Sequence, residues 1–577
     1  MKIVMKPLLS ALVALPLMLG AQPVQAEQPS IYSHMDVAHP VWAANGMVAS
    51  QEALASAVGV EILRQGGNAV DAAVAVGFAL AVTLPRAGNL GGGGFMLLHL
   101  AEGNRDVAID YREMAPAKAH RDMFLNEQGE AEAKLSREHG LAVGVPGTVK
   151  GMELALKNYG TLSLKQVIAP AIELAEKGIT VTPDLSSSLQ GLKRRLWQWP
   201  STRPVFYHPD GSDYQAGERL VQADLARSLK RIAEHGSDGF YKGETARQIA
   251  RSVRQAGGVM TEADLAAYTA VERQPVRGQY RGYEVISMPP PSSGGVHIIQ
   301  MLNMLEGQPI SSMGANSAQT LHWMAESMRR AYADRSEYLG DPDFTQVPVT
   351  GLTSRSYAKA LAAAINPNKA TPSSDIKPGN PIPYESDQTT HYSVVDKWGN
   401  AVSNTYTLNF SYGSGLVAEG TGILLNNEMD DFSAKPGTPN GFGLIGGEAN
   451  EVQPGKRPLS SMSPTIVMKQ QQPFLVTGSP GGSRIITTTL QVIMNVIDHG
   501  MNVAEATAAS RIHHQWWPDE IRAEKSLNPD TKRLLEAMGH KVTVKPSMGS
   551  TQSIMVTEQG LLGASDPRRR GAATLGY

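Results

Sequence analysis

Thr389 and Thr390 stand between Gln388 and His391 in the interior of a 577-residue chain. An internal threonine hydroxyl is a weak nucleophile because it has no base beside it, whereas an N-terminal threonine carries its own base, the α-amine, with a reference pKa of about 7.7–8.0. Attack of the Thr389 hydroxyl on the carbonyl of Gln388, followed by hydrolysis of the ester, would make Thr389 a new N-terminus. The pattern therefore predicts a self-made acyl-transfer site that uses no metal and no cofactor.

The stretch that begins at Thr389 has the pattern of a β-hairpin. TTHYSVVDKWGNAVSNTYTLN alternates apolar and polar residues on both sides of Lys397-Trp398-Gly399. Counting outward from this turn places Thr389 opposite a residue close to Thr407, within one or two positions. A period of two puts Thr405, Thr407 and Asn409 on one face of the return strand. Each is an ordinary strand residue by itself, and the pattern has meaning only if the chain is cut before Thr389.

Other motifs that could carry chemistry have weaker support. The sequence contains no G-x-S-x-G, no H-E-x-x-H and no Walker loop. Gly441, Gly443 and Gly446 have the G-x-G-x-x-G spacing, but the flanking residues indicate neither the strand nor the helix that a dinucleotide site requires, so we expect a flexible loop. His513 and His514 are adjacent, and adjacent side chains point apart on a helix or strand, so we expect no metal site there.

The elements that must position these residues follow from apolar periodicity. Helical spacing is clearest at 50–64 and 69–82, and Asn68 is placed to cap the second helix. Further helices are expected at 161–177, 220–235, 244–256, 316–338 and 483–499. Strands are expected at 389–395, 400–408, 465–469, 473–477, 541–545 and 552–557. The chain is thus helix-rich before Thr389 and strand-rich after it, and a Pro/Gly-dense polar connection, 371–388, ends at that point.

Composition and charge narrow the class of protein. The chain is 42% hydrophobic and 18% charged, with 57 Gly and 36 Pro, which is typical of a globular protein. A net charge of −2 shows no basic excess, and the longest basic run, 568–570, is short, so no nucleic-acid partner is expected. The absence of cysteine excludes disulfides, thiolate metal sites and a cysteine nucleophile. Residues 1–26 combine two lysines, a short apolar run and a small-x-small end, which predicts a signal peptide rather than a membrane anchor.

Six longer motifs resemble those of the γ-glutamyltransferases (γ-glutamyl transpeptidases), within the N-terminal-nucleophile hydrolase superfamily. They are DYREMAP (110–116), GNLGGGGFM (88–96), QTTHYSVVD (388–396), LLNNEMDDF (424–432), RPLSSMSPT (457–465) and TGSPGGSRI (477–485). The resemblance covers nearly the whole mature chain. It implies an α+β fold, the four-layer αββα sandwich, and autocleavage between Gln388 and Thr389. A large subunit, 27–388, and a small subunit, 389–577, would then remain together as a heterodimer.

The resemblance also implies an activity and a set of site residues. The γ-glutamyl group of glutathione and related γ-glutamyl amides would pass to water or to amino-acid and dipeptide acceptors, without a cofactor. Thr389 would be the nucleophile, held in position by Thr407 and Thr405, and the amides of Gly481 and Gly482 would stabilise the oxyanion. A γ-glutamyl group carries an α-carboxylate and an α-ammonium. The matching carboxylate partners are Arg112, Ser460 and Ser461, and the matching ammonium partners are Asn409, Glu428 and Asp431.

Several points stay open at this level. Phe442 occupies the position of a lid tyrosine in several bacterial relatives, which keeps an aromatic cover but removes its hydroxyl. A glutaryl-type β-lactam acylase of the same fold is one alternative, although its substrate lacks the ammonium that Asp431 would bind. A non-catalytic exported binding protein for glutamyl peptides is another, and it would remain one polypeptide. The expected location is outside the cytoplasm, and the periplasm if the source is Gram-negative.

Overall fold

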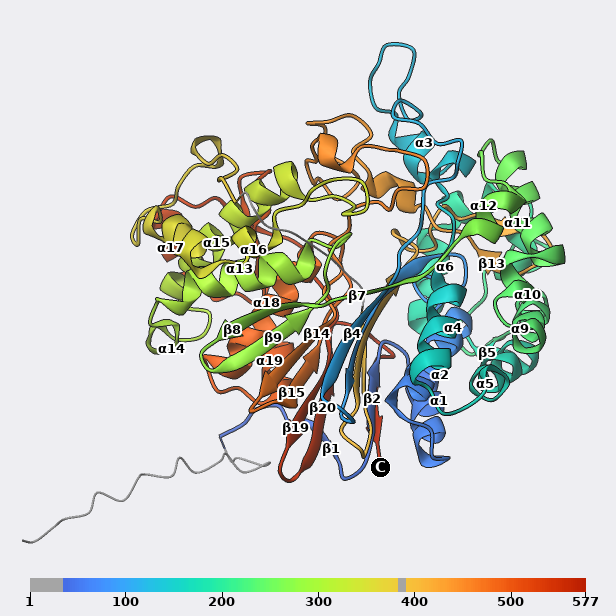
Figure 1. Cartoon of the computed structure of the whole chain (residues 1–577), viewed down its shortest axis with the longest axis horizontal. Helices are drawn as coiled ribbons and strands as arrows, with labels where there is room; N and C mark the ends of the chain where they lie inside the picture. Colours follow the sequence, from blue (N-terminus) through green and yellow to red (C-terminus); the bar gives the residue numbers. More distant parts are fainter. Residues whose placement is uncertain (1–34, 382–390) are drawn as a thin grey trace, which may run out of the picture. The chain divides into compact units, whose positions relative to one another are not determined.

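The computed structural model describes residues 35–381 and 391–577. The chain divides into two units, Met1–Asp36 and Val37–Tyr577, and the helices and strands of the described residues all belong to the second unit. Within this unit, two seven-stranded sheets pack face to face, and helices cover the outer side of each (Figure 1). This is the four-layer αββα sandwich that the resemblance implied. None of the helices in the described part of the chain is both long and apolar enough to cross a membrane.

The first sheet has the order β21-β2-β10-β11-β3-β4-β7, and all neighbouring strands are antiparallel. The predicted hairpin, β10 and β11, lies near its middle. Four of its seven strands come from residues before 382 and three from residues after 390, so neither part of the chain builds the sheet alone. The strands are β21 (Ala573–Gly576), β2 (Met47–Ser50), β10 (Tyr392–Val395), β11 (Ala401–Thr407), β3 (Gly93–Leu100), β4 (Arg105–Tyr111) and β7 (Val271–Arg273).

The second sheet has the order β1-β20-β19-β15-β14-β9-β8 and is also antiparallel throughout. Its strands are β1 (Val41–Ala43), β20 (Gly560–Ser565), β19 (Gln552–Thr557), β15 (Gln472–Thr477), β14 (Thr465–Lys469), β9 (Tyr283–Ser287) and β8 (Val276–Tyr280). Apolar side chains from both sheets, among them Phe95, Ile466 and Val476, form the core between them. The hydrophobic contact of the two inner faces therefore holds the two sheets together.

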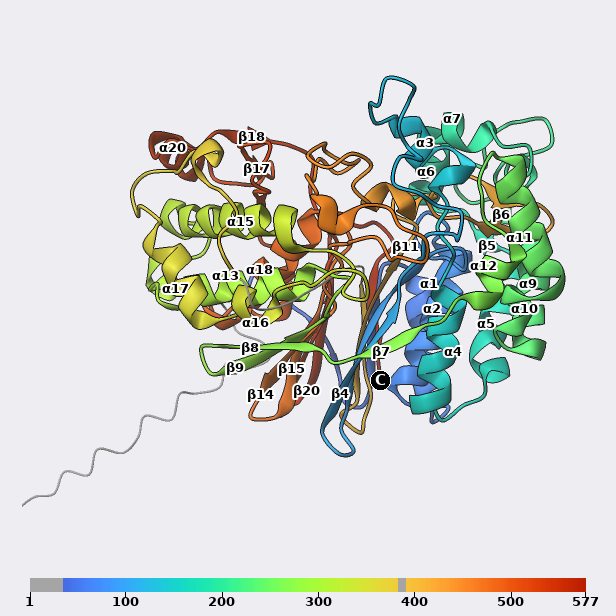
Figure 2. The ribbon, with the colours of Figure 1, turned by 45° about the horizontal axis from the view of Figure 1, so that its top comes forward.

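Two groups of helices cover the sheets, one on each side (Figures 1 and 2). The first sheet is covered by α1 (Ala53–Arg64), α2 (Ala69–Thr83) and α4 (Thr148–Tyr159), with α5 (Leu164–Lys177) packed on α2 and α9 (Ala223–His235) packed on α5. The second sheet is covered by α13 (Gly294–Glu306) and α19 (Val503–Ala508), with α15 (Ala318–Tyr338), α17 (Arg355–Ala363) and α18 (Arg484–Ile497) packed on α13.

Short elements complete the described part of the chain. The short helices are α3 (Ala133–Arg137), α6 (Pro183–Gly191), α7 (Lys193–Trp197), α8 (Arg203–Phe206), α10 (Asp238–Tyr241), α12 (Glu262–Ala267), α14 (Ile310–Met313), α16 (Val349–Leu352) and α20 (Pro529–Ala537), and α11 (Gly243–Gln255) is longer. The small sheets consist of β5 (Ile179–Thr180), β6 (Arg219–Leu220), β12 (Val417–Ala418), β13 (Ile423–Leu424), β16 (Ile512–His513), β17 (Ile521–Ala523) and β18 (Val542–Val544).

The helices expected from periodicity are confirmed. Most begin up to three residues later than predicted, as do α1 and α5, whereas α11 begins one residue earlier. Asn68 caps α2 as expected: its Oδ1 accepts hydrogen bonds from the amides of Val70 and Asp71, at 2.9 and 3.0 Å. The carboxylate of Asp71 in turn accepts from the Asn68 amide, which completes a capping box. α2 is buried on all sides because it lies between the first sheet, α1 and α5.

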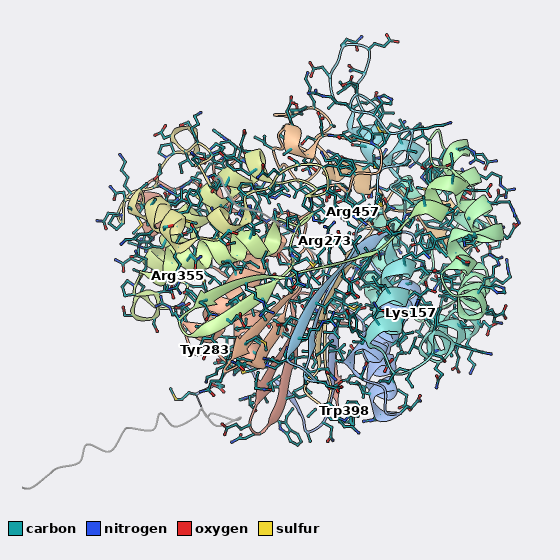
Figure 3. The ribbon with its side chains drawn as sticks, viewed as in Figure 1. Lys157, Arg273, Tyr283, Arg355, Trp398 and Arg457 are labelled. Atoms are coloured by element: carbon teal, nitrogen blue, oxygen red, sulfur yellow. The ribbon has the colours of Figure 1, made fainter. Side chains whose placement is uncertain are left out.

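The predicted hairpin is confirmed for its described residues. Tyr392 lies opposite Asn404, and the turn between the strands is held by Asp396, whose Oδ1 accepts from the amides of Trp398 and Asn400 at 2.9 and 3.0 Å. Gly399 adopts a φ of +88°, which favours glycine. Trp398 marks the tip of this hairpin in Figure 3. Gln388 and Thr389, and with them the first part of the expected strand, lie outside the described residues.

The segment that leads to residue 381 is fastened to α15 by a buried carboxylate. Asp334 accepts hydrogen bonds from Gln300 Nε2 (2.6 Å), the Tyr357 hydroxyl (2.8 Å) and the Gly379 amide (2.7 Å). Burial raises the pKa of Asp334 to about 6. The folded-state pKa is thus higher than that of an unfolded aspartate, near 3.9. The contribution of this group to stability is therefore full below about pH 4 and is lost as the pH rises through 6.

We expect Asp334→Asn to remove this part of the pH dependence. Between pH 4 and pH 7 the free energy of unfolding of the parent protein should fall relative to that of the variant by on the order of 2–3 kcal/mol. Denaturant titrations of both proteins across this range measure the difference, and Asp375→Asn, an exposed site nearby, is the control. Parallel pH profiles for the parent and Asp334→Asn would contradict the prediction.

Candidate active site

Residues from both parts of the chain line one cavity of about 450 Å³ at the end of β11. It brings together nine of the side chains and glycines that the sequence singled out: Thr407, Asn409, Glu428, Asp431, Phe442, Ser460, Ser461, Gly481 and Gly482. Thr405 and Arg112 do not line the cavity. Among the lining residues that sequence reasoning did not find are four arginines and one aromatic residue: Arg86, Arg335, Arg484, Arg569 and Phe410.

The end of β11 supplies the hydroxyl side of the cavity. Thr405 is fully buried, and its Oγ1 lies 3.4 Å from Nδ1 of His391, which also lies 3.2 Å from Ser403 Oγ. Ser403 and Thr405 therefore share one strand face, as period two predicts. Thr407 is farther along and reaches the cavity, where its hydroxyl accepts from the Asn409 amide at 2.8 Å. Burial lowers the pKa of His391 to about 3, so its ring is neutral at physiological pH.

Arg112 lies directly behind the cavity and is fully buried. Its amide donates to Asp110 Oδ1 at 3.0 Å. Asp110 in turn forms ion pairs with Arg273 (2.8 Å) and Arg457 (3.5 Å), two arginines that are labelled in Figure 3. The guanidinium pairs with Glu428 and, at 2.7 Å, with Asp431, while Nε donates to the carbonyl of Pro458 at 3.1 Å. Arg112 thus fixes two carboxylates that face the cavity and contacts the backbone just before Ser460.

The carboxylates around Arg112 outnumber the positive charge. Glu113 is the third, with an oxygen 3.6 Å from the guanidinium and no hydrogen bond from its side chain within the described residues. Burial raises the pKa of Glu113 to about 7 and that of Glu428 well above its ordinary value, although Arg112 opposes both shifts. Burial also raises the pKa of Asp431, again against Arg112. A cationic ligand group beside Glu428 and Asp431 would relieve this unfavourable crowding.

Ser460 and Ser461 form the wall next to this acidic cluster. Arg335, on α15, donates from Nη2 to Ser461 Oγ (3.2 Å) and from Nε to Ser293 Oγ (2.9 Å). Only 5% of Arg335 is exposed, yet it lines the cavity. The cavity therefore presents hydroxyls and a guanidinium close to a carboxylate pair, which is the arrangement expected for a ligand that carries both charges on neighbouring atoms. No signal in the sequence marks Arg335, because α15 lies far from the other motifs in the chain.

The turn from β15 into α18 supplies free backbone amides. Gly481 and Gly482 have φ values of +144° and +60°, and α18 begins at Arg484. Within the described residues neither glycine amide donates a hydrogen bond. A Cβ on Gly482 would lie 2.4 Å from the ring of Phe442. The turn can therefore present two N–H groups to an anion at the start of α18, and the close approach of Phe442 leaves room only for glycine at 482.

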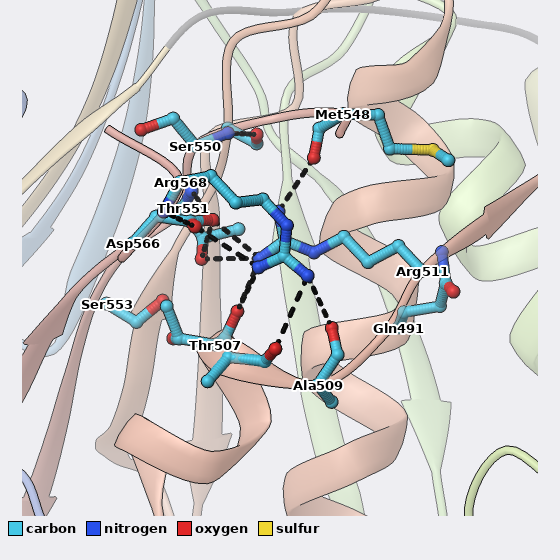
Figure 4. Close-up of polar contacts among 12 residues, drawn as sticks. Gln491, Thr507, Ala509, Arg511, Met548, Ser550, Thr551, Ser553, Asp566 and Arg568 are labelled. Atoms are coloured by element: carbon cyan, nitrogen blue, oxygen red, sulfur yellow. Dashed lines mark hydrogen bonds and ion pairs between the residues drawn. The ribbon is translucent and has the colours of Figure 1, made fainter. Parts of the chain in front are cut away.

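A buried ionic network supports this turn from behind (Figure 4). Arg511 pairs with Asp566 at 2.6 Å and donates to the Met548 carbonyl at 2.8 Å, and Arg568 pairs with Asp566 at 3.2 Å. Both arginines also donate to the Thr507 carbonyl at the end of α19. These contacts fix the chain between Met548 and β19. Within this segment the Ser550 amide donates to Oγ of Ser479, and Ser479 lies two residues before Gly481.

Phe442 lies in a loop, and its ring stacks on Phe410 with centroids 4.7 Å apart and planes at 14°. Between Ser433 and Gly447 the structure has neither helix nor strand, which confirms a loop around the G-x-G-x-x-G glycines. The Gly441 amide donates to Asp430 Oδ2 at 3.0 Å, and Asn440 Nδ2 lies 3.5 Å from Asp431 Oδ1. The loop is therefore tied to the same short segment that carries the acidic cluster.

Clustered histidines elsewhere have protein partners. His513 bonds to Thr487 and Gln515, both at 2.9 Å, and His514 to Asp519 at 3.2 Å. In the described residues, the three groups with metal-ligand spacing are His322, Glu326 and His540. Two arginines already pair with Glu326, and the rings of His322 and His540 are hydrogen-bonded to each other at 2.8 Å. These contacts account for the cluster as a link between α15 and His540, three residues after α20.

Comparisons with known proteins agree on one family. The sequence matches the model described as Gamma-glutamyltranspeptidase over residues 55–576. It is 60% identical over 543 residues to the glutathione hydrolase proenzyme of Escherichia coli (strain K12), covering 94% of this chain and 93% of that protein. A solved gamma-glutamyltranspeptidase from Helicobacter pylori is 48% identical, with a TM-score of 0.58 over 59% of this chain and 98% of that one. The cephalosporin acylase from Bacillus halodurans is 29% identical, with a TM-score of 0.82 over 96% and 99% of the two chains.

Proposed function

The chain belongs to the γ-glutamyltranspeptidase family, and on this premise we propose that it cleaves the γ-glutamyl amide of glutathione and related compounds through a threonine ester. The group then passes to water or to the amine of an amino acid or dipeptide. The observation that carries the proposal is a single cavity in which an excess of carboxylates, two serine hydroxyls and two free backbone amides meet. This combination suits a zwitterionic donor whose carbonyl is attacked.

The proposed nucleophile is the hydroxyl of Thr389 after cleavage behind Gln388. Its oxygen forms a bond to the γ-carbonyl carbon of the substrate, and the α-amine of Thr389 accepts the hydroxyl proton. The negative charge that develops on the carbonyl oxygen is stabilised by the amides of Gly481 and Gly482. Breakage of the amide bond releases the leaving amine with a proton and leaves the γ-glutamyl ester. Water or an acceptor amine attacks this ester and regenerates the hydroxyl.

The register of the hairpin supports the positions of the assisting hydroxyls. Tyr392 lies opposite Asn404, and we propose that in the mature enzyme the same pairing continues, which would bring position 389 opposite Thr407. We propose that Thr407 orients the hydroxyl of Thr389. Thr405, which lies next to His391, supports the strand at this position from the buried side.

The two charges of the γ-glutamyl group, which sit on one carbon, are assigned to neighbouring walls of the cavity. Asn409, Glu428 and Asp431 take the α-ammonium, since the carboxylate crowding around Arg112 favours a cation there. Ser460 and Ser461 take the α-carboxylate with Arg112, which already contacts the carbonyls of Pro458 and Leu459. In the structure Glu428 and Asp431 lie between Arg112 and the cavity, so direct contact of Arg112 with the carboxylate requires these acids to shift. Phe442 covers the bound group as a lid.

Maturation is proposed to give a large subunit, 27–388, and a small subunit, 389–577, after removal of a signal peptide, 1–26. Both sheets take strands from each subunit, so the products remain together through the sheet pairing. Export, and a periplasmic location in a Gram-negative source, are part of the same proposal. No cofactor enters the mechanism.

The proposal is tested with purified protein on a denaturing gel and with two chromogenic substrates. We expect two bands, the smaller with Thr389 as its N-terminus, and turnover of a γ-glutamyl anilide well above that of glutaryl-cephalosporin. One intact band without turnover would favour a binding protein, and preference for the glutaryl compound would favour an acylase. Asp431 argues against the acylase because a glutaryl group offers no ammonium to its buried carboxylate.

We expect Gly482→Ala to lower kcat for the γ-glutamyl anilide by about 10²-fold, with a smaller change in KM. The added Cβ meets the Phe442 ring at 2.4 Å and the φ of +60° is strained for alanine, so the amide that faces the oxyanion is displaced. Gly500→Ala is a matched control, because Gly500 has a φ of +64° with open space around it. An unchanged kcat in Gly482→Ala would remove this glycine from the oxyanion site.

A further inference from the structure

The cavity has a cationic side that the γ-glutamyl group does not use. Arg86, which follows α2, and Arg569, near the C-terminus, both line it. Arg86 is only 7% exposed, and its Nη2 is buried without a hydrogen bond within the described residues. Its Nη1 pairs with Asp184 at 2.5 Å. A buried guanidinium nitrogen without an acceptor is costly, and an anionic or carbonyl group that reached this nitrogen from the cavity would relieve the cost.

Arg569 adds a second guanidinium to the same wall. Its side chain makes no hydrogen bond and no ion pair within the described residues, although it is only partly exposed. Burial lowers the pKa of Arg569, and the neighbouring charge of Arg86 lowers it further. Asp184 pairs with Arg86 alone and acts on Arg569 only through its more distant charge, so one positive charge on this wall is left for a ligand.

The backbone at Arg569 is held in place by the network in Figure 4. Its amide donates to the Asp566 carbonyl at 3.1 Å, and Asp566 pairs with Arg511 and Arg568. Arg568 is fully engaged by Glu524, Thr507 and Ala509, so it is not available to a ligand. The backbone of Arg569 is therefore positioned at the cavity by the buried ion pairs of Asp566, three residues earlier.

We propose that Arg86 and Arg569 form a subsite for the carboxylate of the leaving group of the donor and of the incoming acceptor. The inference rests on the proposed function: with the α-carbon charges at the acidic cluster and the carbonyl at Gly481 and Gly482, the rest of the donor must extend into the remaining wall. In glutathione that part ends in a glycine carboxylate, and amino-acid and dipeptide acceptors carry a carboxylate too. Two guanidiniums with one compensating acid suit such a group.

The test compares three donors with the mature enzyme: glutathione, its glycine monoethyl ester, and a γ-glutamyl anilide. The measured quantity is kcat/KM for glutamate release, expressed as the preference for glutathione over the ester. We expect Arg569→Ala and Arg86→Gln each to lower this preference by about 10- to 100-fold, chiefly through KM. Arg569→Lys should restore part of it, because the charge remains.

Arg570→Ala is the matched control, since Arg570 is the next residue, is exposed and does not line this cavity. It should leave all three activities unchanged. A preference for glutathione over the ester that is the same in Arg569→Ala as in the parent would overturn the subsite, as would equal losses for both compounds. Arg86→Gln loses a buried ion pair. If this variant does not fold, the preference measured with Arg569→Ala decides the test. Failure of the proposed function would look different, because the parent enzyme itself would then release no glutamate from any donor.

Discussion

Thr389→Ala is expected to give a single uncleaved chain that has lost hydrolysis of a γ-glutamyl anilide, by at least about 10³-fold. The alanine removes the hydroxyl that attacks Gln388 and the hydroxyl that attacks the substrate, so one change stops both reactions. His391 is a poor replacement for the α-amine as base, because burial lowers its pKa to about 3 and its ring contacts Ser393, Ser403 and Thr405. Thr389→Ser keeps a hydroxyl and should retain cleavage and part of the activity.

The requirement for Thr389 in cleavage can be separated from its requirement in catalysis by supplying the two subunits as separate chains. Co-expression of residues 27–388 with a separate chain that begins at Thr389 tests whether the free N-terminus alone is sufficient, because both sheets can assemble from the two pieces. The same pair with alanine at position 389 should assemble and remain inactive. Mass spectrometry of the small chain and anilide turnover are the measurements. Turnover in the alanine pair would assign the nucleophile to another residue.

Much of the fold could be predicted because its signals are local. The capping box of Asn68 and Asp71, the turn at Asp396 and the alternation of β11 are each encoded within a few residues. The two-sheet architecture came instead from the resemblance of long motifs. Alternation within a strand does not say which strands pair, and β10 pairs with β2, which lies more than three hundred residues earlier.

The candidate site was predicted less completely, for a related reason. The motif residues reach one cavity, yet Arg86, Arg335 and Arg569 were not recognised, because nothing in their own neighbourhoods distinguishes them from surface arginines. Their burial is created by tertiary packing. The same packing places Arg112 behind Glu428 and Asp431 rather than at the cavity wall, an arrangement that sequence matching alone could not reveal.

Phe442 connects the loop between Ser433 and Gly447 with the glycine turn that precedes α18. Its ring stacks on Phe410 and lies against Gly482, and its loop is tied to Asp430 and Asp431. An aromatic ring without a hydroxyl can therefore still be held in place by stacking and by the loop's own hydrogen bonds. A movement of this loop would therefore change contacts at the acidic cluster and at the glycine turn together.

Asp431→Asn is expected to lower kcat/KM for a γ-glutamyl anilide by about 10²–10³-fold while leaving turnover of the corresponding glutaryl anilide unchanged or raised. Asparagine has nearly the same shape, so the loss measures the charge that faces the α-ammonium. The variant also removes one of the three carboxylates around Arg112, which lessens the crowding that raises the pKa of Glu428. Folding should therefore be preserved, and the two-subunit gel pattern checks this.

The pH profile gives this prediction a second, independent readout. Burial raises the pKa of Asp431, and a protonated acid cannot hold an ammonium group, so kcat/KM of the parent enzyme for the γ-glutamyl compound should rise with pH through a pKa above the usual aspartate range. Deprotonation of the Thr389 α-amine raises kcat/KM for both compounds alike, so the acid limb to compare is that of the ratio of kcat/KM for the γ-glutamyl compound to kcat/KM for the glutaryl compound. This limb should be present in the parent enzyme and absent in Asp431→Asn. Equal losses for both substrates, with the acid limb intact, would mean that Asp431 only shapes the cavity. Selective loss with a vanished acid limb requires an ionised carboxylate in contact with the substrate's amine, because only that contact distinguishes the two donors.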